Sequence, residues 1–182
     1  GGLKNRNAKI EYTTAPTAGH LTVEYQGSTM GLTGIPITTA NSGGAGFDVT
    51  TTEDQGYWKI DNQNLTDGVY TITCTGDGYQ NITNLSKLTL LKRVGTGSWL
   101  CPGTHIAPSG SLTAPVVARS GLVGWSNFGF GGGIGNPLPV ELTAFYVSCV
   151  EDKNETNVHW TTASEQNSAL FVVEKSRDLV NW

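Results

Sequence analysis

Apolar and polar residues alternate over most of this chain, which is the pattern of half-buried β-strands. The clearest example is residues 68–74, where Tyr70, Ile72 and Cys74 fall on one face and Val69, Thr71 and Thr73 on the other. Further strands are predicted at residues 8–12, 20–25, 56–60, 88–94, 98–100, 114–119 and 124–130. Because no segment shows the sustained 3.6-residue repeat of a capped helix, the pattern predicts an all-β, antiparallel β-sandwich.

The segment that follows predicts the beginning of a second β domain. After a Pro-x-Pro hinge, one strand carries Val140 and Leu142 and then, out of strict step, Phe145 and Val147. Two more strands are predicted, one through Val158 and one at residues 171–174. Three strands do not close a sandwich. We therefore expect a β-sandwich at 1–133 and, at 134–182, a linker with the first strands of an incomplete domain.

The predicted boundary is the segment 131–139, where glycine and proline combine flexibility with a short stiff step. The 24 glycines and the low charged fraction of 14% are typical of an extracellular β protein with many turns. No run of apolar residues reaches membrane-spanning length. Since the chain starts Gly1-Gly2 without a signal peptide, we expect it to be a segment of a longer protein.

The net charge of −4 argues against nucleic acid as a partner, because that role requires a concentrated basic surface. The only basic cluster, Lys92-Arg93, is interpreted as a solvated strand end.

Three cysteines leave one without a partner. Cys74 and Cys101 both fall in the first domain, so a disulfide between them is a candidate, and Cys149 would remain over. No cysteine or histidine pair has the spacing of a zinc site. Residues 61–68 offer oxygen ligands but lack the spacing of a calcium loop, and Asp67-Gly68 favours a hairpin turn. We predict no metal and no cofactor.

No catalytic constellation is predicted, and we do not expect an enzyme. Glu53 and Asp54 are adjacent, so on a strand they face opposite ways, and we interpret them as a solvated turn. His105 lies in a predicted loop near Cys101. A Cys–His pair is conceivable there, but no local signature supports it.

Aromatic residues are the remaining candidates for binding. Tyr57 and Trp58 are adjacent, so one faces the core and the other faces outward. An outward ring beside Glu53 and Asp54 would be a candidate carbohydrate contact, although packing within the sandwich is the favoured interpretation of both residues. Trp160 is interpreted as a core residue of the second domain.

Two parts of the chain carry a family resemblance. Residues 137–182 contain LPVEL, WTTASE and VEKS in order, and resemble the start of the fibronectin-type-III-like module near the C-terminus of many Bacteroidetes secreted and cell-surface proteins. In those proteins the module precedes the sorting domain of the type IX secretion system. The first domain is similar to the β-sandwich region that often precedes this module. Its segment RSGLVGWSNF follows the family pattern R-S-G-L-x-G-F-S-x-F, with Trp125 in place of phenylalanine.

The resemblance implies a non-catalytic structural or adhesion module at the cell surface, exported by the type IX system, in a gliding or adhesion protein. Its expected partners are the secretion or anchoring machinery and, as a further candidate, surface polysaccharide. An uncovered edge at residues 171–174 would invite strand addition by another chain. The alternative is a carbohydrate-binding accessory module of a secreted polysaccharide hydrolase, with Tyr57 and Trp58 as its candidate contacts.

Overall fold

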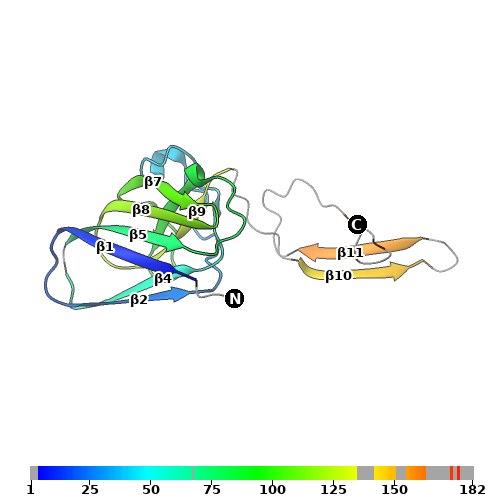
Figure 1. Cartoon of the computed structure of the whole chain (residues 1–182), viewed down its shortest axis with the longest axis horizontal. Helices are drawn as coiled ribbons and strands as arrows, with labels where there is room; N and C mark the ends of the chain where they lie inside the picture. Colours follow the sequence, from blue (N-terminus) through cyan, green and yellow to red (C-terminus); the bar gives the residue numbers. More distant parts are fainter. Residues whose placement is uncertain are drawn as a thin grey trace. The chain divides into compact units, whose positions relative to one another are not determined.

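The computed structural model describes residues 4–66, 68–134, 142–150 and 155–162, together with Val173 and Ser176. The chain divides into two compact units, Gly1–Leu138 and Pro139–Trp182, and the division falls inside the glycine- and proline-containing segment 131–139. The first unit is a β-sandwich of two antiparallel sheets (Figure 1).

The first sheet has four strands in the order β1-β5-β8-β7. These are β1 (Arg6–Thr14), β5 (Val69–Gly76), β8 (Ala114–Leu122) and β7 (Thr104–Ser111).

The second sheet has five strands and is centred on β9 (Asn127–Gly132). On one side, β9 pairs with β4 (Tyr57–Gln63) and, further along, with β3 (Thr51–Thr52). On the other side it pairs with β6 (Leu88–Arg93), while β2 (His20–Gln26) pairs with β4 as an edge strand. Short 3-10 turns lie at Thr39–Asn41 and Leu85–Lys87. The described residues contain no helix long and apolar enough to cross a membrane.

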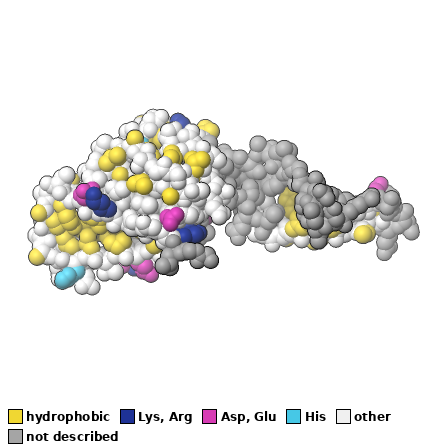
Figure 2. Space-filling model, in the orientation of Figure 1, with side chains coloured by type: hydrophobic (Ala, Val, Ile, Leu, Met, Phe, Trp, Pro, Cys, Tyr) yellow, Lys and Arg dark blue, Asp and Glu magenta, His cyan; other side chains and the backbone are white. Residues whose placement is uncertain are grey.

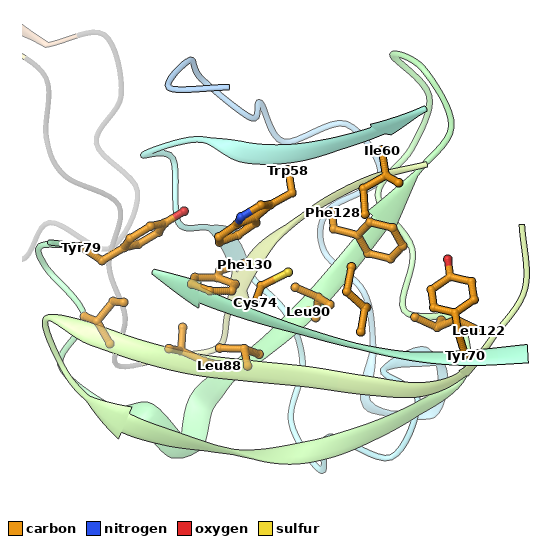
Figure 3. Packing of buried hydrophobic residues seen from close by; sticks show 13 residues of the cluster. Trp58, Ile60, Tyr70, Cys74, Tyr79, Leu88, Leu90, Leu122, Phe128 and Phe130 are labelled. Atoms are coloured by element: carbon orange, nitrogen blue, oxygen red, sulfur yellow. The ribbon is translucent and has the colours of Figure 1, made fainter. Parts of the chain in front are cut away.

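The main core lies between the two sheets and is rich in aromatic rings (Figure 3). Along β5 the predicted alternation is confirmed, since Tyr70, Ile72 and Cys74 are buried and their neighbours are only partly covered. The opposite sheet contributes Trp58, Ile60, Leu88, Leu90, Phe128 and Phe130. Burial of these large apolar side chains is the main stabilising contribution to the sandwich.

A second, smaller core covers the outer face of the second sheet. Leu90 and Leu91 are consecutive on β6, so Leu90 points into the main core and Leu91 into this second core. Most of the other members come from the long connection between β2 and β3. The buried members of this second core are Met30, Ile37, Phe47, Val49, Leu91, Trp99 and Cys101.

Two of the glycines expected in the linker are instead part of a strand. Gly131 and Gly132 end β9, where they pair with β3 and β6. A Cβ on Gly131 would lie 2.7 Å from a methyl carbon of Leu91, and one on Gly133 would lie 2.6 Å from the ring of Phe47. The glycines are therefore explained by the close approach of the second core to the backbone rather than by flexibility.

The segment that we interpreted as a loop around His105 is strand β7. Pro108 obscured it, because proline lacks the N–H that a central strand requires. The strand lies at the edge of its sheet, and its register with β8 shifts between Ile106 and Ser109, which accommodates Pro108. The strand expected at 98–100 is reduced to a single bridge between Lys92 and Leu100.

The second unit contains a two-stranded antiparallel sheet, β10 (Leu142–Cys149) with β11 (Thr156–Thr162). The register shifts between Leu142 and Ala144. This bulge explains why the apolar residues of the sequence change step after Leu142, since one extra residue reverses the facing of those that follow.

The two faces of this hairpin differ. Phe145 lies opposite Trp160 and Val147 opposite Val158, so the four share one face, and Trp160 is 40% exposed. On the other face the rings of Tyr146 and His159 stack at 4.6 Å. The third strand predicted at residues 171–174 lies outside the described residues, apart from Val173, and the strand addition expected there stays a prediction.

Candidate functional site

The two candidate carbohydrate contacts lie on opposite faces of β4. Trp58 is 1% exposed, and its ring packs against Tyr25 and Phe130 in the main core. No face of this indole is available to a sugar, which corrects the candidate contact at Trp58. Tyr57 is half-buried and packs against the second core.

The ring of Tyr57 already has a cationic partner. The guanidinium of Arg93 lies 5.3 Å from the centroid of Tyr57 and 4.2 Å from that of Trp99. Arg93 also donates a hydrogen bond from Nη1 to the carbonyl oxygen of Met30, at 2.7 Å. The contacts of Arg93 with both rings and with the Met30 carbonyl tie the 27–50 connection to the sheet. This is a packing arrangement rather than a flat platform for a pyranose ring.

Cys74 and Cys101, the candidate disulfide pair, are both free thiols. Cys74 belongs to the main core and Cys101 to the second core. The second sheet separates the two cores, so the disulfide prediction is wrong for this structure. Burial raises the pKa of both thiols, although the nearby Arg119 counteracts this at Cys101, and a buried neutral thiol is a poor nucleophile.

Arg119 is the most unusual side chain of the first unit, because it is charged and only 1% exposed. It lies on β8 of the first sheet, between Ala118 and Ser120. Its guanidinium binds backbone carbonyl oxygens and one hydroxyl, and no carboxylate. The acceptors are the carbonyls of Leu90, Cys101, Pro102, Gly103 and Ser42, and Oγ1 of Thr89.

This arrangement satisfies polar groups that the fold would otherwise leave buried. Leu90 lies on the edge strand β6, so its carbonyl has no further strand to bind, and Arg119 Nε reaches it at 2.7 Å. Arg119 Nη2 reaches the carbonyl of Ser42, beside the first 3-10 turn, at 2.5 Å. Several carbonyl dipoles together stabilise the cation, although desolvation lowers the pKa of Arg119. In the sequence Arg119 stands out only as part of the RSGL segment, since a single arginine in a strand does not reveal its burial.

His105 is adjacent to this network, on β7. Its Nδ1 lies 3.1 Å from Oγ1 of Thr89, which also accepts from Arg119. Desolvation, followed by the charge of Arg119, lowers the pKa of His105, which favours the neutral imidazole. Cys101 contributes its backbone carbonyl oxygen to the same network, so histidine and cysteine are both linked to Arg119.

Glu53 differs most from its interpretation as a solvated turn residue. It is 1% exposed, and its N–H donates to the carbonyl of Phe130 at 2.8 Å, which continues the β3–β9 pairing. Its Oε1 has no hydrogen-bond partner, and burial raises the pKa of this carboxyl from 4.5 to about 8. Asp54 is half-buried and accepts a hydrogen bond from the backbone N–H of Met30. The adjacent acids therefore lie in different environments, one enclosed with an unpartnered oxygen and the other hydrogen-bonded to the Met30 backbone.

Of these side chains, Arg119 and Asp54 bind backbone groups, His105 contacts the hydroxyl of Thr89, and the buried Oε1 of Glu53 has no hydrogen-bond partner. Among the residues that the structure describes, no three His, Cys, Asp or Glu side chains lie close enough together to hold a metal ion.

Comparison with known families gives one partial match. Residues 13–90 match the model of the phage tail tube protein C-terminal domain. The matched segment begins at the end of β1 and includes β2, β3, β4, β5 and the first half of β6, which is less than half of the 182 residues. No curated protein and no solved structure matches the chain significantly.

Proposed function

We propose that this chain is a non-catalytic structural module of a large secreted or cell-surface protein, exported by the type IX secretion system. The observation that carries the proposal is the ordered occurrence of LPVEL, WTTASE and VEKS between residues 138 and 176. In this proposal the sandwich separates other parts of the parent protein from its anchoring end. Its direct partner is the secretion or anchoring machinery.

The use of polar groups in the first unit supports a structural role. Three polar side chains of the first unit are candidates for a chemical role because they are buried or partly buried: Arg119, Glu53 and His105. Arg119 is engaged by backbone carbonyls and the Thr89 hydroxyl, His105 is linked to it through Thr89, and the backbone of Glu53 extends the pairing with β9. These contacts join loops and strands into a rigid body. A module that separates other parts of a protein from its anchoring end requires such rigidity.

The family match over residues 13–90 favours a second candidate, a component of a phage tail tube. This candidate is also structural and non-catalytic. It differs from the first in location, because a tail component belongs to a virus particle and a surface module belongs to the outside of the cell.

Fractionation of the native source separates the two candidates. Intact cells are treated with protease, and the released peptides are identified by mass spectrometry beside the cytosolic fraction and purified phage particles. Release of peptides from residues 4–134 by surface digestion is expected for the surface module. Their recovery in phage particles would establish the tail component instead, and their confinement to cytosol would contradict both.

The same experiment tests the export route. Peptides that map to the same protein downstream of Trp182 are expected to include a type IX sorting domain. Deletion of that domain is then expected to abolish surface release, while total protein, measured in whole-cell lysate, stays unchanged. Continued surface release after the deletion would exclude the type IX route.

A further inference from the structure

The open side of the sandwich, where the edge strands β1 and β2 lie, has an unusual surface. Arg6 on β1 donates a hydrogen bond to the hydroxyl of Tyr25 on β2 at 2.8 Å, so the two sheets approach each other at this end. Further along, apolar side chains reach the surface, with Tyr12 39% and Val23 43% exposed. Figure 2 shows hydrophobic side chains gathered between β1 and β2.

The outer edge of β1 offers backbone hydrogen-bonding groups to a partner. β5 pairs with one side of β1 along nearly its whole length, and no strand in the described part of the chain pairs with the other side. Edge strands are usually protected against pairing by charges, prolines or bulges. β1 contains no proline, and its only irregularity lies near its end, between Tyr12 and Thr14.

The two exposed charges of β1 are opposite in sign. Lys9 and Glu11 both face the outer surface of the sheet and form an ion pair of 2.8 Å, with 65% and 56% of their side chains exposed. Figure 2 shows a basic and an acidic side chain adjacent on this face. Such a pair contributes little to the stability of the monomer.

The charges do select one way of pairing β1 with a second copy of itself. In antiparallel strands, directly opposed residues point to the same face of the sheet. When the two strands are identical and related by a two-fold axis, one residue therefore lies opposite its own copy, and that residue defines the register. The register centred on Ile10 places Lys9 of each copy opposite Glu11 of the other. Registers centred on Lys9 or Glu11 place like charges face to face, and opposite-charge pairs are favoured over like-charge pairs.

The same register also suits the inner face. Ala8 of one copy lies opposite Tyr12 of the other, which places a small residue against an exposed ring. The partner's strand would extend the four-stranded sheet across the symmetry axis, and the exposed apolar side chains between β1 and β2 would be covered. The other edge strand, β2, is a weaker candidate for pairing with a second copy. Its charged residue Glu24 already lies opposite the oppositely charged Lys59 of β4 in the same molecule.

We propose that β1 is a self-association edge, at which two copies of this chain pair antiparallel through β1 about Ile10. The occupant is a second copy because the β1 sequence is complementary to itself in this register and in no neighbouring symmetric one. The result is an isologous dimer in which one sheet runs through both molecules. This inference is independent of the cellular location proposed above.

Charge reversal tests the register. Sedimentation velocity of the 182-residue chain, measured from micromolar to millimolar concentration, is expected to show a monomer–dimer equilibrium. Lys9→Glu is expected to weaken dimerisation roughly tenfold or more, because two opposite-charge pairs become like-charge pairs. The double variant Lys9→Glu/Glu11→Lys exchanges the two charges and is expected to restore the dimer.

A matched control is available on β4. Lys59 and Asp61 form an exposed ion pair of the same spacing at 2.7 Å, but β4 is an interior strand between β2 and β9. Lys59→Glu is expected to leave the dimerisation constant unchanged. Thermal unfolding of each variant establishes that the monomer remains folded.

Cross-linking supplies a second, independent measurement. Opposed residues in antiparallel strands have Cα atoms about 4.5–5.5 Å apart, which is within the disulfide range. In a Cys149→Ser background, a mixture of Lys9→Cys and Glu11→Cys is expected to form a disulfide-linked dimer, whereas either variant alone is not.

The proposal is overturned if the chain stays monomeric at all concentrations. It is equally overturned if Lys9→Glu leaves the dimer intact, if the exchanged pair fails to restore it, or if Lys9→Cys alone cross-links as well as the mixture does.

Discussion

Nε of Arg119 on β8 donates a hydrogen bond of 2.7 Å to the carbonyl oxygen of Leu90 on β6, which joins the two sheets of the sandwich through a buried guanidinium. The remaining guanidinium nitrogens bind the 101–103 segment and Ser42. One side chain therefore connects two strands and two loops. Because its acceptors are backbone carbonyls, its loss leaves several buried acceptors without donors.

Replacement of Arg119 is expected to destabilise the first unit strongly. Arg119→Met keeps much of the side-chain volume and removes every donor, and we expect a loss of about 3–5 kcal/mol in the free energy of unfolding. Urea unfolding followed by tryptophan fluorescence measures it. Lys59→Met, at an exposed site, is expected to change stability by less than about 0.5 kcal/mol. A similar small effect for Arg119→Met would show that the network is not required.

Two adjacent glycines test the same network from the loop side. Gly43 and Gly44 both have positive φ, 64° and 81°, so alanine is strained at each. A Cβ on Gly43 would also meet Nη1 of Arg119 and lie 2.7 Å from the carbonyl oxygen of Cys101, whereas a Cβ on Gly44 would meet open space. We expect Gly44→Ala to cost about 1 kcal/mol and Gly43→Ala roughly 2 kcal/mol more. Equal losses in thermal unfolding would contradict the close approach of Arg119.

Glu53 is expected to make stability depend on pH. Its pKa is raised in the folded protein to about 8, above the ordinary 4.5, because burial disfavours the carboxylate. Folding therefore favours the neutral carboxylic acid of Glu53 over its carboxylate. This contribution is complete below about pH 4.5 and is lost as the pH rises to about 8, a change on the order of 3–5 kcal/mol.

Glu53→Gln removes the titrating group, and we expect it to flatten the decline in stability between about pH 5 and pH 9. Urea unfolding at several pH values measures this. Glu24→Gln, on the exposed face of β2, is expected to keep the wild-type decline. A wild-type protein whose stability does not fall over this range would show that Glu53 is charged or partnered when folded.

Trp58 and Tyr57 are expected to respond differently to truncation. Trp58→Ala removes a fully buried ring of the main core and should cost about 3–5 kcal/mol. Tyr57→Ala removes a half-buried ring that contacts Arg93 and Trp99 and should cost about 1–2 kcal/mol. Chemical unfolding of the two variants compares them directly. Loss of polysaccharide binding by a stably folded Trp58→Ala protein would contradict the core position of this residue.

The cysteines are expected to separate into two classes of reactivity. Cys149 is exposed, while Cys74 and Cys101 are buried with raised pKa values. Titration of the native protein with a thiol reagent should therefore modify one cysteine rapidly, and unfolding should release the other two. Mass spectrometry of the modified peptides identifies the sites. A disulfide between Cys74 and Cys101 in the isolated protein would contradict the placement of the two residues in separate cores.

The sequence alone determined the class of fold and the faces of its main strands. Alternation along residues 68–74 predicted which side of β5 is buried, because successive side chains of a strand point to opposite faces whatever the strand pairs with. The change of step after Leu142 was visible too, although its cause, a bulge, required the register of the β10–β11 pair.

Only the tertiary structure decided where polar and small residues lie, because their burial depends on partners distant in the chain. Arg119 is buried since carbonyls from residues 42, 90 and 101–103 converge on it. Glu53 is buried since its backbone extends the pairing with β9, and Gly131 is required since Leu91 packs onto it from β6. Local periodicity reports which face of an element is apolar, whereas convergence of distant segments determines which polar groups are enclosed.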